Sequence, residues 1–359
     1  MMSVPSDAVA LLRDRLERIA AWRSTRGVDA VVLRRAENLA WITGGGDLRV
    51  SREGDAVADA VVTDAGLTLI TNRIEAARLE REIAPPGTRF EVVPWHEPGA
   101  RAKALARLTV DLRTANDGEY DLAELRLPLT SLECERFEYV GGLAARALTD
   151  AASALRPDMR EYDVAAEVHL SARRAGLELP VVLVAGAERF ARYRHPVVSD
   201  AAFGAYGLIV VCAQRFGLIA SLTRTVAFGS VPDELAERLE RVLRVEAAML
   251  DATRPGVATN EVLRAARDAY AEVGEPDAWL DHHQGGPAGY TPREWLATPS
   301  ETRPLLAGTP VAWNPSLPLA KSEDTFMVER DAPPRNLTWD DRWPSVTVAG
   351  RKRASVRVL

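Results

Sequence analysis

The sequence predicts an α/β (α+β) protein of two domains, in which a small α/β domain precedes a larger domain made of two related helix-plus-strand units. Helical and strand-like periods alternate over residues 8–125. A polar stretch with turn residues closes that region, as is typical of a domain boundary. An internal repeat lies within residues 129–359. A chain of 359 residues is also long for a single core, which favours two domains.

The elements of the first domain follow from its periodicity. Residues 9–27 repeat apolar side chains at helical spacing and end at Gly27, which predicts a helix. Next, "VDAVVLRR" and "LAWITGG" indicate a buried strand and a strand that runs into a turn. "AVVTDAGLTLIT" predicts a hairpin around residues 64–66, and "RIEAARLEREIA" predicts a helix that ends before two prolines. "FEVVPW" and "LTVDLR" supply two further strands.

The second domain begins with a long helix for which Ser131 is the expected N-cap. Two stretches in this domain then resemble each other: "ALRPDMREYDVAAEV" at 154–168 and "ATRPGVATNEVLRAA" at 252–266. Both contain an Arg-Pro turn, a spacer, an acidic residue and a valine. Each follows one helix and begins another, and strand-like segments come after each. The repeat therefore predicts two pseudo-symmetric helix-plus-strand units.

Composition and charge narrow the class of protein. A net charge of -6 argues against a nucleic-acid partner, which would need a basic face. The opening "MMSVPSDAVALLRDRLERI" carries charges where a signal peptide needs an apolar core, and no apolar run is long enough to span a membrane. Cys134 and Cys212 are too few for a disulfide framework, so we expect buried free thiols. These features together predict a cytoplasmic enzyme-sized protein without a nucleic-acid or membrane partner.

The densest group of chemically useful side chains is "WLDHHQGGPAGYTPREW", residues 279–295. His282, His283 and Gln284 lead into a glycine-rich bend, where backbone N–H groups can approach a ligand closely. Neighbours along a strand point to opposite faces, and no third ligand is evident, so we do not expect this pair to bind zinc. The alternative is that both histidines are hydrogen-bonded wall residues. Phosphate loops, dinucleotide-binding glycine motifs and serine-nucleophile elbows are absent from the sequence.

A second informative stretch is "RFARYRHPVVSD". A histidine with a pKa near 6.5, such as His195, accepts and donates protons at neutral pH, which suits hydrolysis of a C–N bond. Arg194 beside it is a candidate anchor for a substrate carboxylate. The alternative is an exposed loop that carries a histidine and solvated charges.

Several motifs, in order along the chain, resemble the pita-bread fold family, which includes aminopeptidase P, prolidase, methionine aminopeptidase and creatinase. "RLERIAAWRSTRGVDAVVLRRAENLAWITG" is similar to the opening of a creatinase-type N-terminal domain, and "LRPDMREYDVAAEV" to the family's Pro-Gly-Met-x-Glu turn and helix. "FGLIASLTRTV" resembles the strand pair Gly-Tyr-x-Ser-Asp-x-Thr-Arg-Thr, and "KSEDTFMV" the terminal Arg-x-Glu-Asp-Thr strand. The resemblance covers nearly the whole chain. It implies a creatinase-like domain over 8–125, a pita-bread domain over 129–359 and a homodimer.

The resemblance also shows that this sequence lacks most of the residues that bind the family's catalytic metals. Peptidases of the family hold two divalent metals with two Asp, one His and two Glu. The matching positions here are Val210, Ser221, Gly286, Asn314 and Glu323, and only the last of them is acidic. Divalent cations need several anionic or imidazole donors in fixed geometry. We therefore expect no metal and no other cofactor.

The same resemblance suggests roles for the remaining polar residues. His195 matches the proton-shuttling histidine of creatinase, His282 matches a histidine that contacts substrate in the peptidases, and Arg293 stands at the family's second active-site histidine. We predict that the catalytic residues are His195, His282, His283 and Glu323. The predicted substrate-binding residues are Arg194, Arg224, Gln284, Arg293, Glu294, Asn314 and Lys321. The alternative is that these charges form ion pairs that only stabilise the core.

Three functional hypotheses follow. The first is a metal-independent, creatinase-like enzyme that uses histidine acid–base catalysis on a small nitrogen-containing carboxylate substrate, most simply to hydrolyse a C–N bond or to run a related biosynthetic step. The second is a non-catalytic pseudopeptidase that binds a peptide or a protein. The third is a metal-dependent Xaa-Pro aminopeptidase, which requires the alignment of the metal-ligand positions to be wrong. A small-molecule or dipeptide-like substrate is expected for the enzymes.

Overall fold

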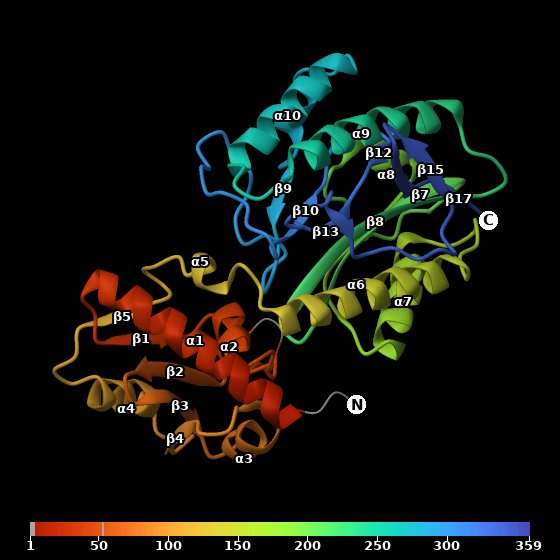
Figure 1. Ribbon diagram of the computed structural model, residues 1–359. Helices are drawn as coiled ribbons and strands as arrows, with labels where there is room; N and C mark the ends of the chain where they lie inside the picture. The colour runs from red at the N-terminus through yellow and green to blue at the C-terminus, as the bar shows by residue number, and fades with distance from the viewer. Residues whose placement is uncertain (1–3, 52–53) are drawn as a thin grey trace. The chain divides into compact units, whose positions relative to one another are not determined.

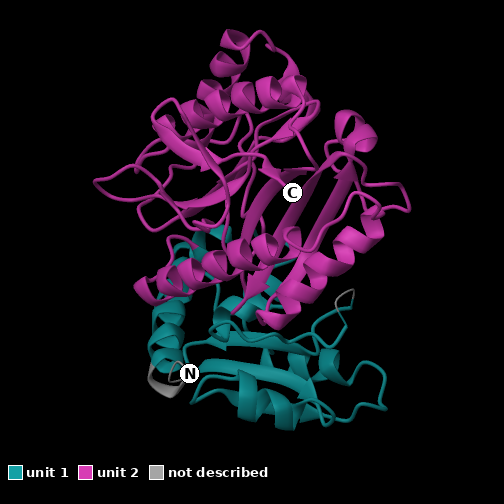
Figure 2. Cartoon of the chain, turned by 90° about the vertical axis from the view of Figure 1, so that its right-hand side faces the viewer, with its two compact units in different colours: residues 1–126 teal, residues 127–359 magenta. Residues whose placement is uncertain are grey.

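The chain divides into two compact units, residues 1–126 and residues 127–359, which are coloured separately in Figure 2. The computed structural model describes residues 4–51 and 54–359 (Figure 1). The first three residues of the N-terminal segment discussed above therefore lie outside the described residues. No helix among the described residues is both long enough and apolar enough to cross a membrane.

The first unit is built around a five-stranded sheet with the strand order β4-β3-β2-β1-β5. Its strands are β1 (Ala30–Leu33), β2 (Ala58–Thr63), β3 (Gly66–Asn72), β4 (Arg89–Val93) and β5 (Thr114–Asn116). Its helices are α1 (Val4–Arg26), α2 (Ala36–Ile42), α3 (Ala76–Arg78) with a following π-helical turn (Leu79–Ile83), α4 (Ala100–Leu108) and α5 (Ala123–Arg126). The predicted hairpin is confirmed, because β2 and β3 pair in antiparallel fashion with Thr63 opposite Gly66.

Two strand predictions in this unit are wrong. "LAWITGG" contributes to α2 rather than to a strand, because a carboxylate distant in sequence fixes the start of that helix. Asp117 accepts hydrogen bonds from the backbone N–H groups of Arg34 and Arg35, each at 2.8 Å, and from the side chain of Asn38 at 3.0 Å. "LTVDLR" begins at the last residue of α4 and continues as a turn, so that β5 begins only after it. Tertiary contacts override local preference in the first case.

The second unit contains two sheets, each with a pair of long helices. The first half consists of α6 (Ser131–Ala152), α7 (Glu161–Arg174), β6 (Glu178–Gly186), α8 (Ala187–Arg192), β7 (Tyr206–Arg215) and β8 (Leu218–Ala227). The second half consists of α9 (Asp233–Ala252), α10 (Thr259–Glu272), a 3₁₀ turn (Ala278–Asp281), β9 (Gly285–Pro287), β10 (Pro310–Trp313), β11 (Ser316–Leu317), β12 (Ala320–Lys321), β13 (Asp324–Met327) and β14 (Arg335–Asn336). A last hairpin, β15 (Ser345–Val348) and β16 (Arg351–Ala354), precedes β17 (Arg357–Val358).

The internal repeat corresponds to these two halves. One Arg-Pro turn lies between α6 and α7 and the other lies between α9 and α10, as the sequence predicts. The N-cap of α6 is Thr130 rather than Ser131, because its side chain and that of Glu133 form a reciprocal capping box. The strand orders are β17-β8-β7-β6 in one sheet and β14-β13-β10-β9 in the other.

The two sheets meet where β8 lies beside the start of β13 (Figure 1). The backbone N–H of Thr223 donates to the carbonyl of Glu323 at 2.8 Å, and the N–H of Ser221 donates to the side chain of Thr325 at 2.9 Å. This junction brings side chains from both halves of the repeat together in the interior.

A buried ion network lies close to the same junction. The Arg353 guanidinium, on β16, contacts the Glu246 carboxylate of α9 at 2.5 Å and the Asp324 carboxylate of β13 at 2.7 Å. Arg224, on β8, contacts Asp324 as well, at 2.9 Å. All four side chains are almost fully buried. Removal of one partner therefore leaves a buried charge uncompensated.

We predict that Arg353→Met destabilises the protein strongly. Loss of the guanidinium leaves the buried Glu246 carboxylate without its cation, which costs about 3–5 kcal/mol in the free energy of unfolding. Urea denaturation measures the difference. Lys352→Met is the matched control, because Lys352 forms an ion pair with Asp341 at the surface. An equal loss of stability in both variants would contradict the role of the buried network.

Candidate functional site

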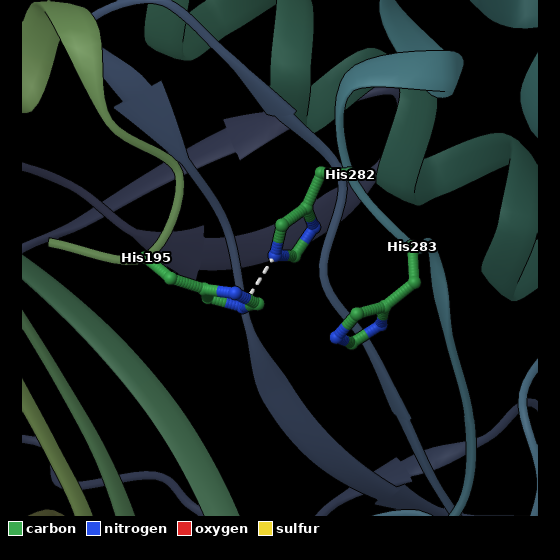
Figure 3. A group of neighbouring side chains, drawn as sticks. All are labelled: His195, His282 and His283. Carbon is green, nitrogen blue, oxygen red and sulfur yellow. Dashed lines mark hydrogen bonds between the residues drawn. The ribbon is translucent and has the colours of Figure 1, made fainter.

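Three of the chain's five histidines form one cluster (Figure 3). His195 lies in the loop after α8, and His282 and His283 follow the 3₁₀ turn that precedes β9. The Nε2 atoms of His195 and His282 are 2.9 Å apart. The rings of His282 and His283 stack with their centroids 4.5 Å apart. One candidate ligand nitrogen of each ring lies within 4.8 Å of the others.

The cluster corrects two expectations about the histidine pair. His282 and His283 do not point to opposite faces, because β9 begins only at Gly285 and the alternation of a strand does not apply before it. A third histidine, His195, is also present, and it is supplied by a loop far away in the sequence.

The environment of the cluster keeps the imidazoles neutral near pH 7. Burial, and then the positive charge of Lys321, lowers the pKa of His282 to about 2. Burial and the positive charge of Arg293 lower the pKa of His283 to about 4. The pKa of His195 is lowered by burial and by the same two cations, although Glu323 opposes the change. A neutral imidazole has one nitrogen that donates and one that accepts, and the hydrogen bond between His195 and His282 uses one of each.

Beside the histidines lies a buried ion cluster of Lys321, Arg293 and Glu323. The Glu323 carboxylate contacts Arg293 at 2.7 Å and Lys321 at 3.1 Å, and it accepts a hydrogen bond from the Thr223 hydroxyl at 2.8 Å. Burial alone would raise the pKa of Glu323, but the two cations and these hydrogen bonds lower it to about 2. Two cations and one carboxylate leave a net positive charge.

Two of the positions that match the family's metal ligands cannot serve that purpose. Val210 lies buried in β7 and offers no donor. Gly286 lies in β9, where an added Cβ would approach the backbone carbonyl oxygen of Trp295 to 2.1 Å. A histidine therefore does not fit at position 286 unless the loop around Trp295 moves.

The other three positions are occupied in ways that exclude a pair of cations. Arg293 donates to the Ser221 hydroxyl at 3.2 Å and contacts Glu323, so its positive charge stands between two of the ligand positions. Asn314 is neutral, and its buried Oδ1 atom has no hydrogen-bond partner among the described residues. Since only one anionic donor remains, these residues do not fit the two metals of the family.

Gln284 and Arg194 hold the loops that carry the histidines. The Gln284 amide donates to the carbonyl of His282 at 2.6 Å, and its oxygen accepts from the Tyr270 hydroxyl at 3.0 Å. Arg194 contacts Asp281 at 3.7 Å, which connects the His195 loop to the 3₁₀ turn before His282. The sequence suggests substrate contacts for both residues, whereas the structure shows positioning contacts.

Two other predicted substrate-binding residues are engaged elsewhere. Arg224 belongs to the ion network with Asp324 and donates to the backbone carbonyl of Thr338 at 2.7 Å. The Glu294 carboxylate accepts from the backbone N–H of Tyr290 at 2.8 Å and holds the turn after β9. We therefore do not include Arg224 and Glu294 in the candidate site.

Thr223 was not among the predicted site residues, although it holds the carboxylate of Glu323. A signal for it exists in the sequence: residues two apart on a strand share a face, so Thr223 lies on the same face as Ser221. The sequence predicts a strand here, and Ser221 on that face matches one of the family's metal-ligand positions.

Comparison with known proteins agrees with this architecture. The sequence model of Metallopeptidase family M24 matches residues 135–330, and that of the Creatinase/Prolidase N-terminal domain matches residues 15–120. A Xaa-Pro dipeptidase of Pyrococcus horikoshii is 22% identical over 92% of this chain and 99% of its own length. One from Pyrococcus furiosus is 27% identical over 62% of this chain and 66% of its own length. The solved Xaa-Pro dipeptidase from Bacillus anthracis has a TM-score of 0.78 at 17% identity, and the match covers 97% of this chain and all of that one.

These comparisons confirm the fold and correct the first functional hypothesis. The chain has a creatinase-like N-terminal domain followed by a pita-bread domain. The hypothesis of a metal-independent, creatinase-like enzyme is wrong, because the curated relatives are Xaa-Pro dipeptidases. They agree better with the third hypothesis, a peptidase.

We predict that Glu323 makes the protein sensitive to acid. Its pKa is about 2 in the folded state against 4.5 for the free side chain, so its contribution is complete above about pH 5 and falls as the pH drops toward 2. The free energy of unfolding should lose on the order of 2 kcal/mol from this group between about pH 5 and pH 3. Urea midpoints measured across this range test the expectation.

Glu323→Gln removes this titrating group. The variant is expected to be less stable than the wild type at neutral pH, because Lys321 and Arg293 lose their counter-charge, but to depend less on pH. Glu272→Gln, at an exposed position of α10, is the control and should keep the wild-type slope. Equal slopes for Glu323→Gln and the wild type would show that this carboxylate is not held as described.

Proposed function

Since the chain belongs to metallopeptidase family M24, we propose that it hydrolyses the peptide bond of dipeptides, with Xaa-Pro dipeptides as the first substrate class. Family membership and the dipeptidase relatives that match over most of the chain support a hydrolase of small peptides. The residues at the family's metal-ligand positions do not fit two metal ions, so they do not contribute to this proposal.

One observation carries this proposal: three neutral imidazoles converge beside an ion cluster with a net positive charge. Hydrolysis of a peptide bond needs a group that activates water, and a dipeptide needs a partner for its free carboxylate. The histidine cluster supplies the first requirement, and the cluster of Lys321, Arg293 and Glu323 supplies the second. Both requirements are met by adjacent side chains of one unit.

The polar atoms without a partner suggest where a substrate binds. The Nε atom of Arg293 and the Oδ1 atom of Asn314 are buried and have no hydrogen-bond partner among the described residues. Such atoms are uncommon in folded proteins. In our proposal the N–H of Arg293 donates to the substrate carboxylate, with the charge of Lys321 assisting. Asn314 then accepts a hydrogen bond from an N–H group of the substrate.

The reaction consumes one water molecule. In our proposal His195, His282 and His283 hold and polarise the water, whose oxygen attacks the carbonyl carbon of the substrate. The positive charge of Lys321 and Arg293 stabilises the negative charge that develops on the carbonyl oxygen. The C–N bond then breaks, and the proton given up by the water is delivered to the leaving nitrogen.

We further propose that the protein is a cytoplasmic homodimer. Cys134 and Cys212 are both free thiols, which agrees with a reducing compartment. The homodimer is proposed from the family resemblance alone, and sedimentation velocity of the purified protein tests it.

We predict that His195→Ala lowers kcat/KM for an Xaa-Pro dipeptide by about 10²- to 10⁴-fold, because the exposed imidazole is the member of the cluster that a substrate reaches first. The full-length protein, assayed as purified and without chelator, is given Ala-Pro, Leu-Pro and Ala-Ala. His169→Ala, at an exposed position of α7, is the control and should retain wild-type activity.

One outcome would reject the proposed mechanism, and another would reject the proposed function itself. Cleavage that persists in His195→Ala would remove the histidine cluster from the reaction. Binding of dipeptides without any turnover by the wild type would favour the second hypothesis, a pseudopeptidase. The pseudopeptidase hypothesis is tested because the family's metal ligands are replaced in this chain.

A further inference from the structure

We propose that His195, His282 and His283 together bind one divalent transition-metal ion. The binding is argued from the geometry of the cluster, and only its catalytic consequence rests on the proposed function. Neutral imidazole nitrogens are suitable ligands for zinc, copper, iron and nickel. Three of them with an open fourth position is a ligand set used by catalytic zinc.

The distances between the rings fit a shared ion. The Nε2 atoms of His195 and His282 are 2.9 Å apart, and one nitrogen of His283 lies within 4.8 Å of both partners' ligand atoms. Two nitrogens bound to a tetrahedral zinc at about 2.0–2.1 Å from the metal lie about 3.3 Å apart. Small ring rotations therefore suffice to place all three nitrogens around one ion. Figure 3 shows the three side chains turned toward a common point.

The loops that carry the ligands are held in place by polar contacts. Gln284 binds the carbonyl of His282 at 2.6 Å and is itself fixed by Tyr270. The contact between Arg194 and Asp281 connects the loop of His195 to the turn before His282. Supporting contacts of this kind preorganise a binding site before its ligand arrives.

The buried imidazoles have polar atoms that the protein does not satisfy. His282 is 7% exposed, and its Nδ1 atom has no hydrogen-bond partner among the described residues. The Nδ1 atom of His283 is also buried without a partner. Buried polar atoms of this kind usually contact a ligand, an ion or an ordered water. The Nε2 atoms of His195 and His282 share a hydrogen bond of 2.9 Å, and an ion beside both rings would take the place of its proton.

The neighbouring charges act in two directions. Lys321 and Arg293 oppose the approach of a cation, and Glu323 offsets only one of these positive charges. The same two cations favour an anion as the fourth ligand of the metal, either hydroxide or a carboxylate. We therefore expect a site that binds its metal more weakly than an isolated three-histidine site. A metal ion held there would lower the pKa of a bound water and so supply the nucleophile for hydrolysis.

This site shares no residue with the positions that match the family's two metals. Those positions are Val210, Ser221, Gly286, Asn314 and Glu323. The histidine site also takes one ion instead of two. Stoichiometry and mutagenesis can therefore separate the two possibilities.

The test is metal binding by the purified full-length chain after chelator treatment. We expect about one equivalent of Zn²⁺ by isothermal titration and by elemental analysis after dialysis. Co²⁺ should give intense visible absorption bands of a four-coordinate ion. His282→Ala, His283→Ala and His195→Ala should each weaken Zn²⁺ binding more than about 100-fold, since loss even of outer partners costs 10- to 100-fold. Far-UV circular dichroism shows whether each variant is folded.

His169→Ala is the matched control, and Glu323→Gln tests the alternative that the metal is held at the family's positions. His169 is an exposed histidine outside the cluster, so its loss should leave the affinity for Zn²⁺ and the Co²⁺ spectrum unchanged. Binding of two equivalents that Glu323→Gln abolishes, with no effect of the histidine variants, would overturn the proposal and restore the family's site. Absence of stoichiometric binding by the wild type would overturn it as well.

The results also separate this inference from the proposed function. Histidine-dependent Zn²⁺ binding without cleavage of dipeptides would support the metal site and reject the peptidase. Cleavage of dipeptides by protein that binds no Zn²⁺ or Co²⁺ would reject the metal site and support the peptidase.

Discussion

The contact between β8 and β13 is the constraint on which the rest of the site depends. A backbone hydrogen bond of 2.8 Å from Thr223 to Glu323 joins the two halves of the repeat. The Thr223 hydroxyl also donates a hydrogen bond to the Glu323 carboxylate. Glu323 therefore stays in the interior, where a lone carboxylate would be very unstable. Lys321 and Arg293 provide the compensating charge. Both cations therefore lie next to Glu323, at the contact between β8 and β13.

The charges of this site differ in sign from those that the family's peptidases place around their metals. In peptidases of the family several carboxylates face two metal ions, whereas here two side-chain cations face one carboxylate. Burial, together with this excess positive charge, keeps the histidines unprotonated at neutral pH. Unprotonated imidazoles are good ligands and good proton acceptors. The fold supplies the position, and the charges decide the chemistry.

The sequence predicted the architecture better than the site. The Arg-Pro repeat and the strand patterns identified both halves of the second domain, because these signals are local. Asp117 reaches the start of α2 from a distant part of the chain, so the helical state of "LAWITGG" could not be seen locally. The sequence grouped His195, His282 and His283 as catalytic residues but not as ligands of one ion, because His195 and His282 meet only in three dimensions. Arg224 looked like a ligand-binding residue because its partner, Asp324, is remote in sequence.

The close approach of β9 to the loop at Trp295 limits how this chain can be redesigned. Because a Cβ at position 286 would collide with the carbonyl of Trp295, a single substitution cannot install the family's histidine there. The Trp295 loop would have to be rebuilt together with that residue. An engineered version of the family's site therefore requires a new backbone path beside β9 as well as new ligands.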